Sequence, residues 1–127
     1  VTVKVLQGII VDIENYSVKF KEKTVANNRK IELKNFSYQL MNKKDSADFI
    51  RFDLDFKEKE KGFSSLHANA DPKKWGSEHL IFQENIDLNL KKLELSKAYY
   101  IFLHYVHHPE EHPYDKNKNY WYKKQLD

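Results

Sequence analysis

The sequence contains no cysteine, which excludes disulfide bonds and cysteine-based catalytic or metal sites within its 127 residues. Three glycines and three prolines are too few for a collagen-like or mucin-like chain. No apolar stretch approaches the roughly 20 residues that a membrane-spanning helix needs, and no signal-peptide pattern opens the chain. We therefore expect a cytoplasmic protein. No glycine-rich phosphate loop or serine nucleophile elbow is found either, so kinases and dinucleotide enzymes are excluded.

The charge balance is nearly even, because 22 basic and 19 acidic residues leave a net charge of only +3, too small to indicate nucleic-acid binding by itself. Aromatic residues make up 14% of the chain. Each large ring buries on the order of 150 to 250 Å², so these residues supply a compact core despite a mean hydropathy of -0.81. No linker or repeat divides the sequence, and we expect one domain over residues 1–127, with a flexible or partner-docking tail at about 114–127.

The first part of the chain is predicted to form antiparallel strands. Residues 1–13 are dense in β-branched side chains, which favour a strand, although part of this segment also fits helical spacing. Apolar and polar residues alternate over 16–21, and the polar segment 26–30 indicates a turn into a further strand at 31–41. Consecutive strands joined by short turns are expected to pair as a meander.

The clearest strand is residues 48–56, where the even-numbered side chains are apolar and most odd-numbered ones are polar. Two further strands are expected at 63–70 and 78–84, around a turn at 71–77, and their apolar residues are again even-numbered. Burying the even-numbered set together places the odd-numbered residues on the opposite face. That face then carries Arg51, Asp53, Asp55, His67, Asn69 and His79.

A helix is predicted from Ser96, as its N-cap, to about residue 107, where Pro109 stops it. Its apolar stripe, which we expect to pack on the apolar face of the sheet, consists of Leu95, Ala98, Tyr99, Phe102, Tyr105 and Val106. The sequence thus predicts an α+β fold, with an antiparallel β-sheet of about five to six strands and one main C-terminal helix packed on one face.

The polar face of the predicted sheet holds the residue types that metal-independent cleavage of RNA requires. One histidine of the pair His67 and His79 can deprotonate the 2′-hydroxyl while the other protonates the leaving oxygen. Arg51 can stabilise the charge at the phosphate, and Asp53 can orient a histidine or hold Arg51 by a bidentate pair. Polar residues also alternate on any half-exposed sheet, so an ordinary solvated face is the competing interpretation.

The order of these motifs is similar to that of a group of small prokaryotic proteins. Arg51-Phe52-Asp53 in a strand is followed by Leu66-His67-Ala68-Asn69, by Glu78-His79-Leu80-Ile81-Phe82 and by an aromatic-rich helix. Over residues 36–106 the chain resembles the TumE-like toxin components of toxin–antitoxin pairs. The resemblance implies an α+β domain that acts on RNA or is neutralised by a partner such as an antitoxin, with Arg51, Asp53, His67 and His79 at the polar motif positions.

Two C-terminal segments are further candidates. His104 and His108 have the spacing with which two helical histidines share a zinc ion, and His107 and His112 lie nearby. Pro109 disfavours helical geometry at His108, so we prefer partly exposed histidines at a helix C-terminus and assign no metal and no cofactor. The second segment could stack RNA bases and neutralise phosphates, or instead pack in the structure; its residues are Tyr120, Trp121, Tyr122, Lys123 and Lys124.

We therefore expect a small toxin-like ribonuclease that acts on RNA by metal-independent acid–base chemistry. The alternative is a binding module without enzymatic activity, such as a phage- or mobile-element-encoded inhibitor or immunity protein, whose aromatic residues contribute to an interface. RNA cleavage without added metal favours the first hypothesis. A stoichiometric protein partner without nuclease activity favours the second.

Overall fold

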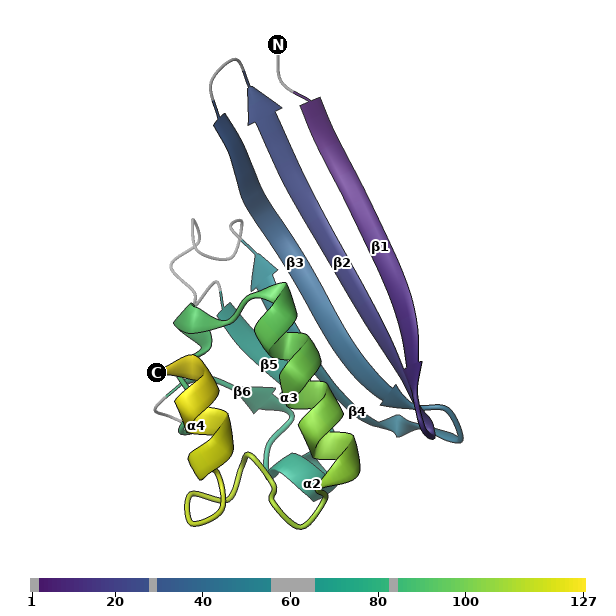
Figure 1. The fold of residues 1–127 in the computed structure, drawn as a ribbon, viewed down its shortest axis with the longest axis vertical. Coiled ribbons are helices and arrows are strands. Elements are labelled where there is room, and N and C mark those ends of the chain that lie inside the picture. Colours follow the sequence, from purple (N-terminus) through teal and green to yellow (C-terminus); the bar gives the residue numbers. More distant parts are fainter. Residues whose placement is uncertain (1–2, 28–29, 56–65, 83–84) are drawn as a thin grey trace.

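The computed structural model describes residues 3–27, 30–55, 66–82 and 85–127, with the backbone alone described for residues 3–7, 27, 34 and 55. Six antiparallel strands lie in the sheet in sequence order (Figure 1). They are β1 (Val3–Ile13), β2 (Tyr16–Asn27), β3 (Lys30–Asn42), β4 (Asp45–Asp55), β5 (Leu66–Ala70) and β6 (His79–Leu80). With its helices, this sheet forms the α+β fold that the sequence predicts.

The helices gather on one face of the sheet, and β1 to β3 extend well beyond them (Figure 1). The short helix α2 (Pro72–Trp75) connects β5 to β6, and a 3-10 turn covers Leu90–Lys92. The main helix α3 (Leu95–His107) packs on β2 and β3, and α4 (Tyr120–Leu126) lies beside α3. Across the described ranges, no helix is long and apolar enough to span a membrane.

The even-numbered side chains of β2 to β6 form the covered face of the sheet, which packs against α3. Phe52 of β4 stacks on Phe102 of α3, with ring centroids 5.6 Å apart and 12° between the ring planes. The buried residues of this face are Val18, Phe20, Phe36, Tyr38, Leu40, Ile50, Phe52, Ala68, Ala70 and Leu80. Because full burial of a large apolar side chain contributes about 1.5 to 3 kcal/mol, this set fixes which face of each strand turns inward.

The start of α3 differs from its prediction. The helix begins at Leu95, and its N-cap is Glu94, whose backbone is extended. The expectation that Ser96 is the N-cap is therefore wrong; Ser96 lies in the first turn, and its Oγ donates to Glu94 Oε1 at 3.1 Å. Because Leu93 is buried and Leu95 packs on the core, the chain enters the helix before Ser96. The end of the helix at His107 agrees with the prediction.

The strand expected over residues 78–84 is shorter than predicted. β6 contains only His79 and Leu80, after which the Ile81 N–H donates to Asn85 Oδ1 at 3.3 Å and the Asn85 N–H donates to the Ile81 oxygen at 3.0 Å. The loop beyond this turn buries a set of core residues that the sequence reading missed, namely Ile86, Leu88, Leu90 and Leu93. Residues 56, 63–65 and 83–84 of the expected strands lie outside the described residues.

The expected turn at 71–77 contains a helix and a core residue. Asp71 caps α2 by accepting a hydrogen bond from the Lys73 N–H at 3.1 Å, and Gly76 ends the helix with a φ of 80°. A Cβ at Gly76 would also lie 2.8 Å from the ring of Tyr114, so glycine is needed there for both conformation and space. Trp75 is 2% exposed and belongs to the core.

The C-terminal segment is folded where a flexible or partner-docking tail was expected. Tyr122 and Leu126 of α4 are both fully buried at a spacing of one helical turn, so this helix presents one apolar side to the core. Lys123 Nζ lies 3.1 Å from Asp87 Oδ2, which links α4 to the loop after β6. Residues 120–126 are therefore part of the packed helical layer.

The burial of α4 predicts a strong dependence of stability on Tyr122. We expect Tyr122→Ala to lower the free energy of unfolding by about 3 to 5 kcal/mol, because it removes a fully buried ring. Tyr120→Ala is the matched control in the same helix, since Tyr120 is 78% exposed, and should change stability by no more than about 0.5 kcal/mol. Urea denaturation measures both, and equal losses for the two variants would contradict the packing of α4.

Asp48 joins the ends of three strands to α2. Its Oδ2 accepts hydrogen bonds from the Tyr16 hydroxyl at 2.8 Å, from Asn42 Nδ2 at 3.1 Å and from Lys74 Nζ at 2.7 Å. Burial by itself would raise the pKa of Asp48, but the three donors outweigh it and lower this pKa below its usual value. Because the unfolded chain then binds the proton more tightly, the stabilisation is present above the ordinary carboxyl pKa and is lost as the pH falls through the folded pKa.

We expect Asp48→Asn to lower the free energy of unfolding at pH 7 by about 2 kcal/mol, since it removes the charged partner of Lys74 and leaves one donor poorly satisfied. The variant should also lose less stability than the parent chain when the pH drops below about 4. Asp45→Asn, at an exposed position, is the control and should follow the parent curve. Urea titrations at several pH values test this, and parallel acid curves for Asp48→Asn and the parent would refute it.

Candidate functional site

The face of the sheet opposite α3, here called the open face, carries two adjacent rows of polar side chains. The first row runs across five strands as Lys19, Gln39, Arg51, Asn69 and His79, each paired with the next. The second row runs across four strands as Lys21, Ser37, Asp53 and His67. Directly paired residues of antiparallel strands have Cβ atoms about 4.5 to 5.5 Å apart, so the register itself assembles a polar cluster from distant parts of the chain.

Asp53 is the centre of this cluster. Its Oδ2 accepts hydrogen bonds from Arg51 Nε and from Asn69 Nδ2, both at 2.8 Å, and lies 3.8 Å from His67 Nε2. The Asp53 side chain is only 17% exposed, so these contacts are partly shielded from water. The bond from Arg51 uses Nε, and among the described residues no hydrogen bond engages the two Nη groups, which can therefore contact a second anion.

The two histidines of the open face form a stacked pair. The rings of His67 and His79 have centroids 4.7 Å apart and planes 21° apart. The His67 side chain is 14% exposed and approaches Asp53, whereas His79 is exposed on the short edge strand β6. The sequence prediction that these histidines share a face with Arg51 and Asp53 is confirmed by this arrangement. The side chain of Asp55, the remaining carboxylate predicted for this face, lies outside the described residues.

Positively charged side chains line a depression that includes Asp53, on the side of β2 and β3. The depression has a volume of about 240 Å³ and is lined by Lys19, Lys21, Ser37, Gln39, Arg51 and Asp53. Three of these side chains are positively charged and one is negatively charged, so the depression suits an anion. The sequence reading missed both lysines and their two neutral neighbours. All four residues are odd-numbered, which was the available signal that they share the open face. Only the pairing of β2 with β3 and of β3 with β4 places them beside Arg51.

The aromatic segment of α4 does not lie on the open face. Tyr122 is fully buried, so the expectation that it stacks an RNA base is wrong, and Lys123 is paired with Asp87. Trp121 is half-buried, and only Tyr120 and Lys124 are exposed. α4 belongs to the helical layer beside α3, which separates it from the polar rows by the thickness of the sheet (Figure 1). Tyr120, Lys123 and Lys124 line a depression of about 450 Å³ together with Lys116, Asn119 and Asp127. RNA binding by these groups stays a prediction, separate from the polar rows.

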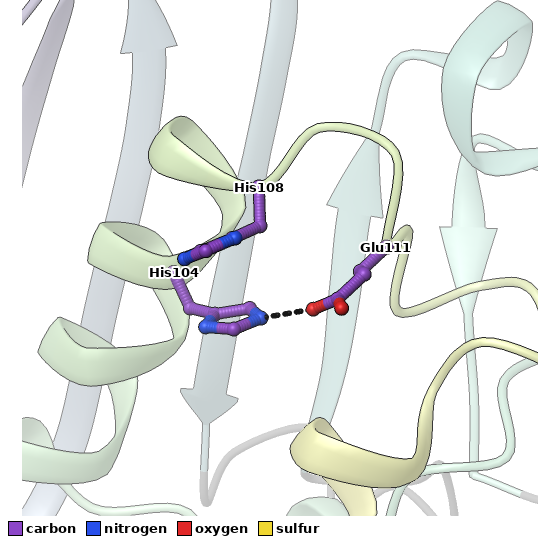
Figure 2. Close-up of side chains that lie close together, drawn as sticks. All are labelled: His104, His108 and Glu111. Atoms are coloured by element: carbon purple, nitrogen blue, oxygen red, sulfur yellow. Dashed lines mark hydrogen bonds and ion pairs between the residues drawn. The ribbon is translucent and has the colours of Figure 1, made fainter.

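The C-terminal histidines separate into different environments. His104 and His108 stack with centroids 4.3 Å apart, and His104 Nε2 lies 2.7 Å from Glu111 Oε2 (Figure 2). His107 approaches Glu14 instead, at 3.6 Å. His112 packs edge-on against Trp75, with centroids 4.5 Å apart, and burial lowers its pKa to about 4, with Lys74 acting in the same direction. His112 is thus a neutral, half-buried residue at pH 7 and, like His107, does not join His104 and His108.

The geometry leaves two polar centres, one around Asp53 on the open face and one around His104 at the end of α3. The open-face centre has the charged groups, the solvent access and the paired imidazoles that a reaction on a phosphate ester needs. A scan of protein-family models, a search of curated proteins and a search of solved structures each find no match to this chain.

Proposed function

We propose that the open face binds single-stranded RNA and cleaves it by metal-independent acid–base chemistry. The observation that carries this proposal is the convergence of Arg51, Asn69 and His67 on Asp53. His79 stacks on His67, and two lysines line the adjoining depression. Strands β2 to β6 each contribute one or two residues, and the helices leave this side of the sheet uncovered. The function is that of a toxin-like ribonuclease.

Binding of the RNA backbone follows from the charge of the depression. Lys19, Lys21 and Arg51 can contact successive phosphates, while the amide of Gln39 and the hydroxyl of Ser37 supply hydrogen bonds without adding charge. Asp53 holds Arg51 in place through Nε, so less side-chain freedom is lost when the guanidinium contacts a phosphate. A face built from strands also accepts an extended single strand more readily than a rigid duplex.

The stacked histidines supply the proton transfers. His79 is the exposed ring and takes the proton from the 2′-hydroxyl, whose oxygen then bonds to phosphorus. His67, in its protonated form beside Asp53, donates a proton to the 5′-oxygen as the bond from phosphorus to that oxygen breaks. The products are a 2′,3′-cyclic phosphate and a 5′-hydroxyl end.

A protein partner is the second part of this proposal. The motifs that resemble TumE-like toxins contain Arg51, Asp53, His67 and His79, and a toxin of this kind is held inactive by an antitoxin. An antitoxin that covers the open face would block both the lysines and the histidine pair. Acidic side chains on such a partner would match the cationic depression.

Purified protein is expected to cleave a single-stranded RNA in the presence of EDTA, and His79→Ala should slow cleavage at least about 100-fold, since it removes a general base. His107→Ala is the matched control, because His107 is also exposed but lies at the end of α3. Gel analysis of a labelled RNA measures the rates, and the cyclic phosphate end identifies the chemistry. Cleavage that survives the double change of His67 and His79 to Ala would reject the catalytic assignment.

Binding can be tested separately from cleavage with the lysine pair. Changing Lys19 and Lys21 to Gln should weaken binding of single-stranded RNA and reduce the slope of log affinity against log salt by about 1.4, that is, about 0.7 for each lost phosphate contact. The same changes at Lys116 and Lys118 alter the net charge equally and should leave the slope unchanged. Fluorescence anisotropy at several salt concentrations is the measurement, and equal effects of both pairs would indicate unspecific attraction.

The edge of the sheet supports the alternative, a binding module without enzymatic activity. β1 pairs with β2 on one side only, and within the described residues no strand pairs with its other edge. Ile9 and Ile10 on this edge strand are 54% and 67% exposed. An open edge with exposed apolar side chains can pair with a strand of a partner. This function is preferred if the protein neither binds nor cleaves RNA in the two experiments above.

A further inference from the structure

We propose that His104, His108 and Glu111 form a binding site for a zinc ion at the C-terminal end of α3. Each residue offers one donor atom, and the three donor atoms all lie within 4.8 Å of one another. Figure 2 shows the two imidazole rings one above the other, with the Glu111 carboxylate reaching toward them from the loop after the helix. The proposal is independent of the proposed reaction on RNA.

The distances are close to those of a zinc site. With metal–ligand bonds of about 2.0 to 2.1 Å, the donor atoms of a tetrahedral site are about 3.3 Å apart. His104 Nε2 and Glu111 Oε2 are already 2.7 Å apart. The side chains of His108 and Glu111 are 49% and 46% exposed, so they can make the remaining adjustment, on the order of 1 Å, by side-chain rotation.

The proposed ion would lie between His104 Nε2 and Glu111 Oε2, which are in direct contact. At 2.7 Å the imidazole nitrogen and the carboxylate oxygen are joined by a hydrogen bond whose donor depends on the tautomer of His104. A dication replaces this hydrogen bond by binding a lone pair of each atom, and the neutral imidazole then carries its proton on Nδ1. His108, one helical turn after His104, then supplies the third donor. The hydrogen bond from the His108 N–H to the His104 oxygen, 2.7 Å long, keeps the helical spacing of the two residues despite Pro109.

Packing orients the His104 ring before any ion binds. Trp121 of α4 stacks on it with centroids 3.9 Å apart and planes 7° apart, and His108 stacks at 4.3 Å and 22°. Two rings that are both nearly parallel to His104 at these distances must occupy its opposite faces, so the ring is held between them. Its side chain is 14% exposed. A ligand held in this way loses little freedom on binding.

The ligand types select the class of ion. Imidazole nitrogen with carboxylate oxygen suits zinc, whereas magnesium and calcium prefer oxygen ligands alone. A second carboxylate, Glu110, has its Oε1 3.6 Å from His108 Nδ1 and adds negative charge beside the dication. Three protein ligands leave a coordination position for water or a substrate atom, which is the pattern of zinc sites that are not purely structural.

The neighbouring histidine provides a matched control. His107 lies between the two histidine ligands in sequence, is 47% exposed and contacts Glu14, so it does not belong to the cluster. The histidine pair of the open face is a second control, because His67 and His79 are also stacked but lie on the other side of the sheet. Zinc bound at either place would be distinguished from zinc bound at His104.

The test is a calorimetric titration of the full chain with zinc chloride at pH 7.5, after treatment with EDTA and removal of the chelator. We expect one zinc ion per chain, a rise in the melting temperature with zinc, and no heat with magnesium. His108→Ala and Glu111→Gln should each weaken zinc binding by at least about 10- to 100-fold. His107→Ala and His79→Ala should bind as the parent chain does. Cobalt in place of zinc should give the visible absorption bands of a tetrahedral site.

Absence of zinc binding by the parent chain would overturn the proposal. So would affinity that is unchanged in both His108→Ala and Glu111→Gln, or that is lost in His79→Ala instead. His104→Ala is left out of the decisive set because it also removes the stack on Trp121. His108 and Glu111 are half-exposed, so circular dichroism spectra that match the parent chain confirm that their variants are folded.

Discussion

The register of the sheet is the constraint on which the rest of the structure depends. Side chains alternate across each strand, so burying Phe52 under α3 turns Arg51 and Asp53 to the opposite side. A slip of one residue in β4 would move the phenylalanine to water and both charges into the core, where an unpaired charge is far more costly than any lost apolar contact. The open-face cluster is therefore a direct consequence of the burial that stabilises the fold.

The two polar centres arise from different kinds of spacing. The centre around Asp53 is built from residues of five strands, which meet because antiparallel pairing brings distant positions opposite one another. The centre around His104 is built from one helical turn and the loop after it, so its residues are near neighbours in the sequence. They lie on opposite sides of the sheet. A change at one centre should thus leave the other intact, so the proposed RNA chemistry and the proposed metal binding can be tested separately.

Sequence reasoning succeeded where periodicity alone decides the outcome. The alternation in residues 48–56 identified β4 and the shared face of Arg51 and Asp53, and the aromatic-rich helix ended at its predicted residue. It failed where packing between distant segments decides which residues are buried. Trp75 and Tyr122 lie in polar stretches that resemble a turn and a tail, yet each fills a space that only the assembled core provides. The composition of these two segments does not indicate that such a space exists in the folded protein.

The sequence by itself determined the α+β class, the alternating strands and the placement of the odd-numbered polar residues, because these follow from a period of two along a single strand. Only the tertiary structure decided which residues become lateral neighbours. The addition of Lys19 and Lys21 to the cluster depends on strand pairing, and the removal of His112 from the histidine group depends on burial beside Trp75. Both depend on contacts between segments far apart in the chain, whose relative positions are set by the free energy of the whole core.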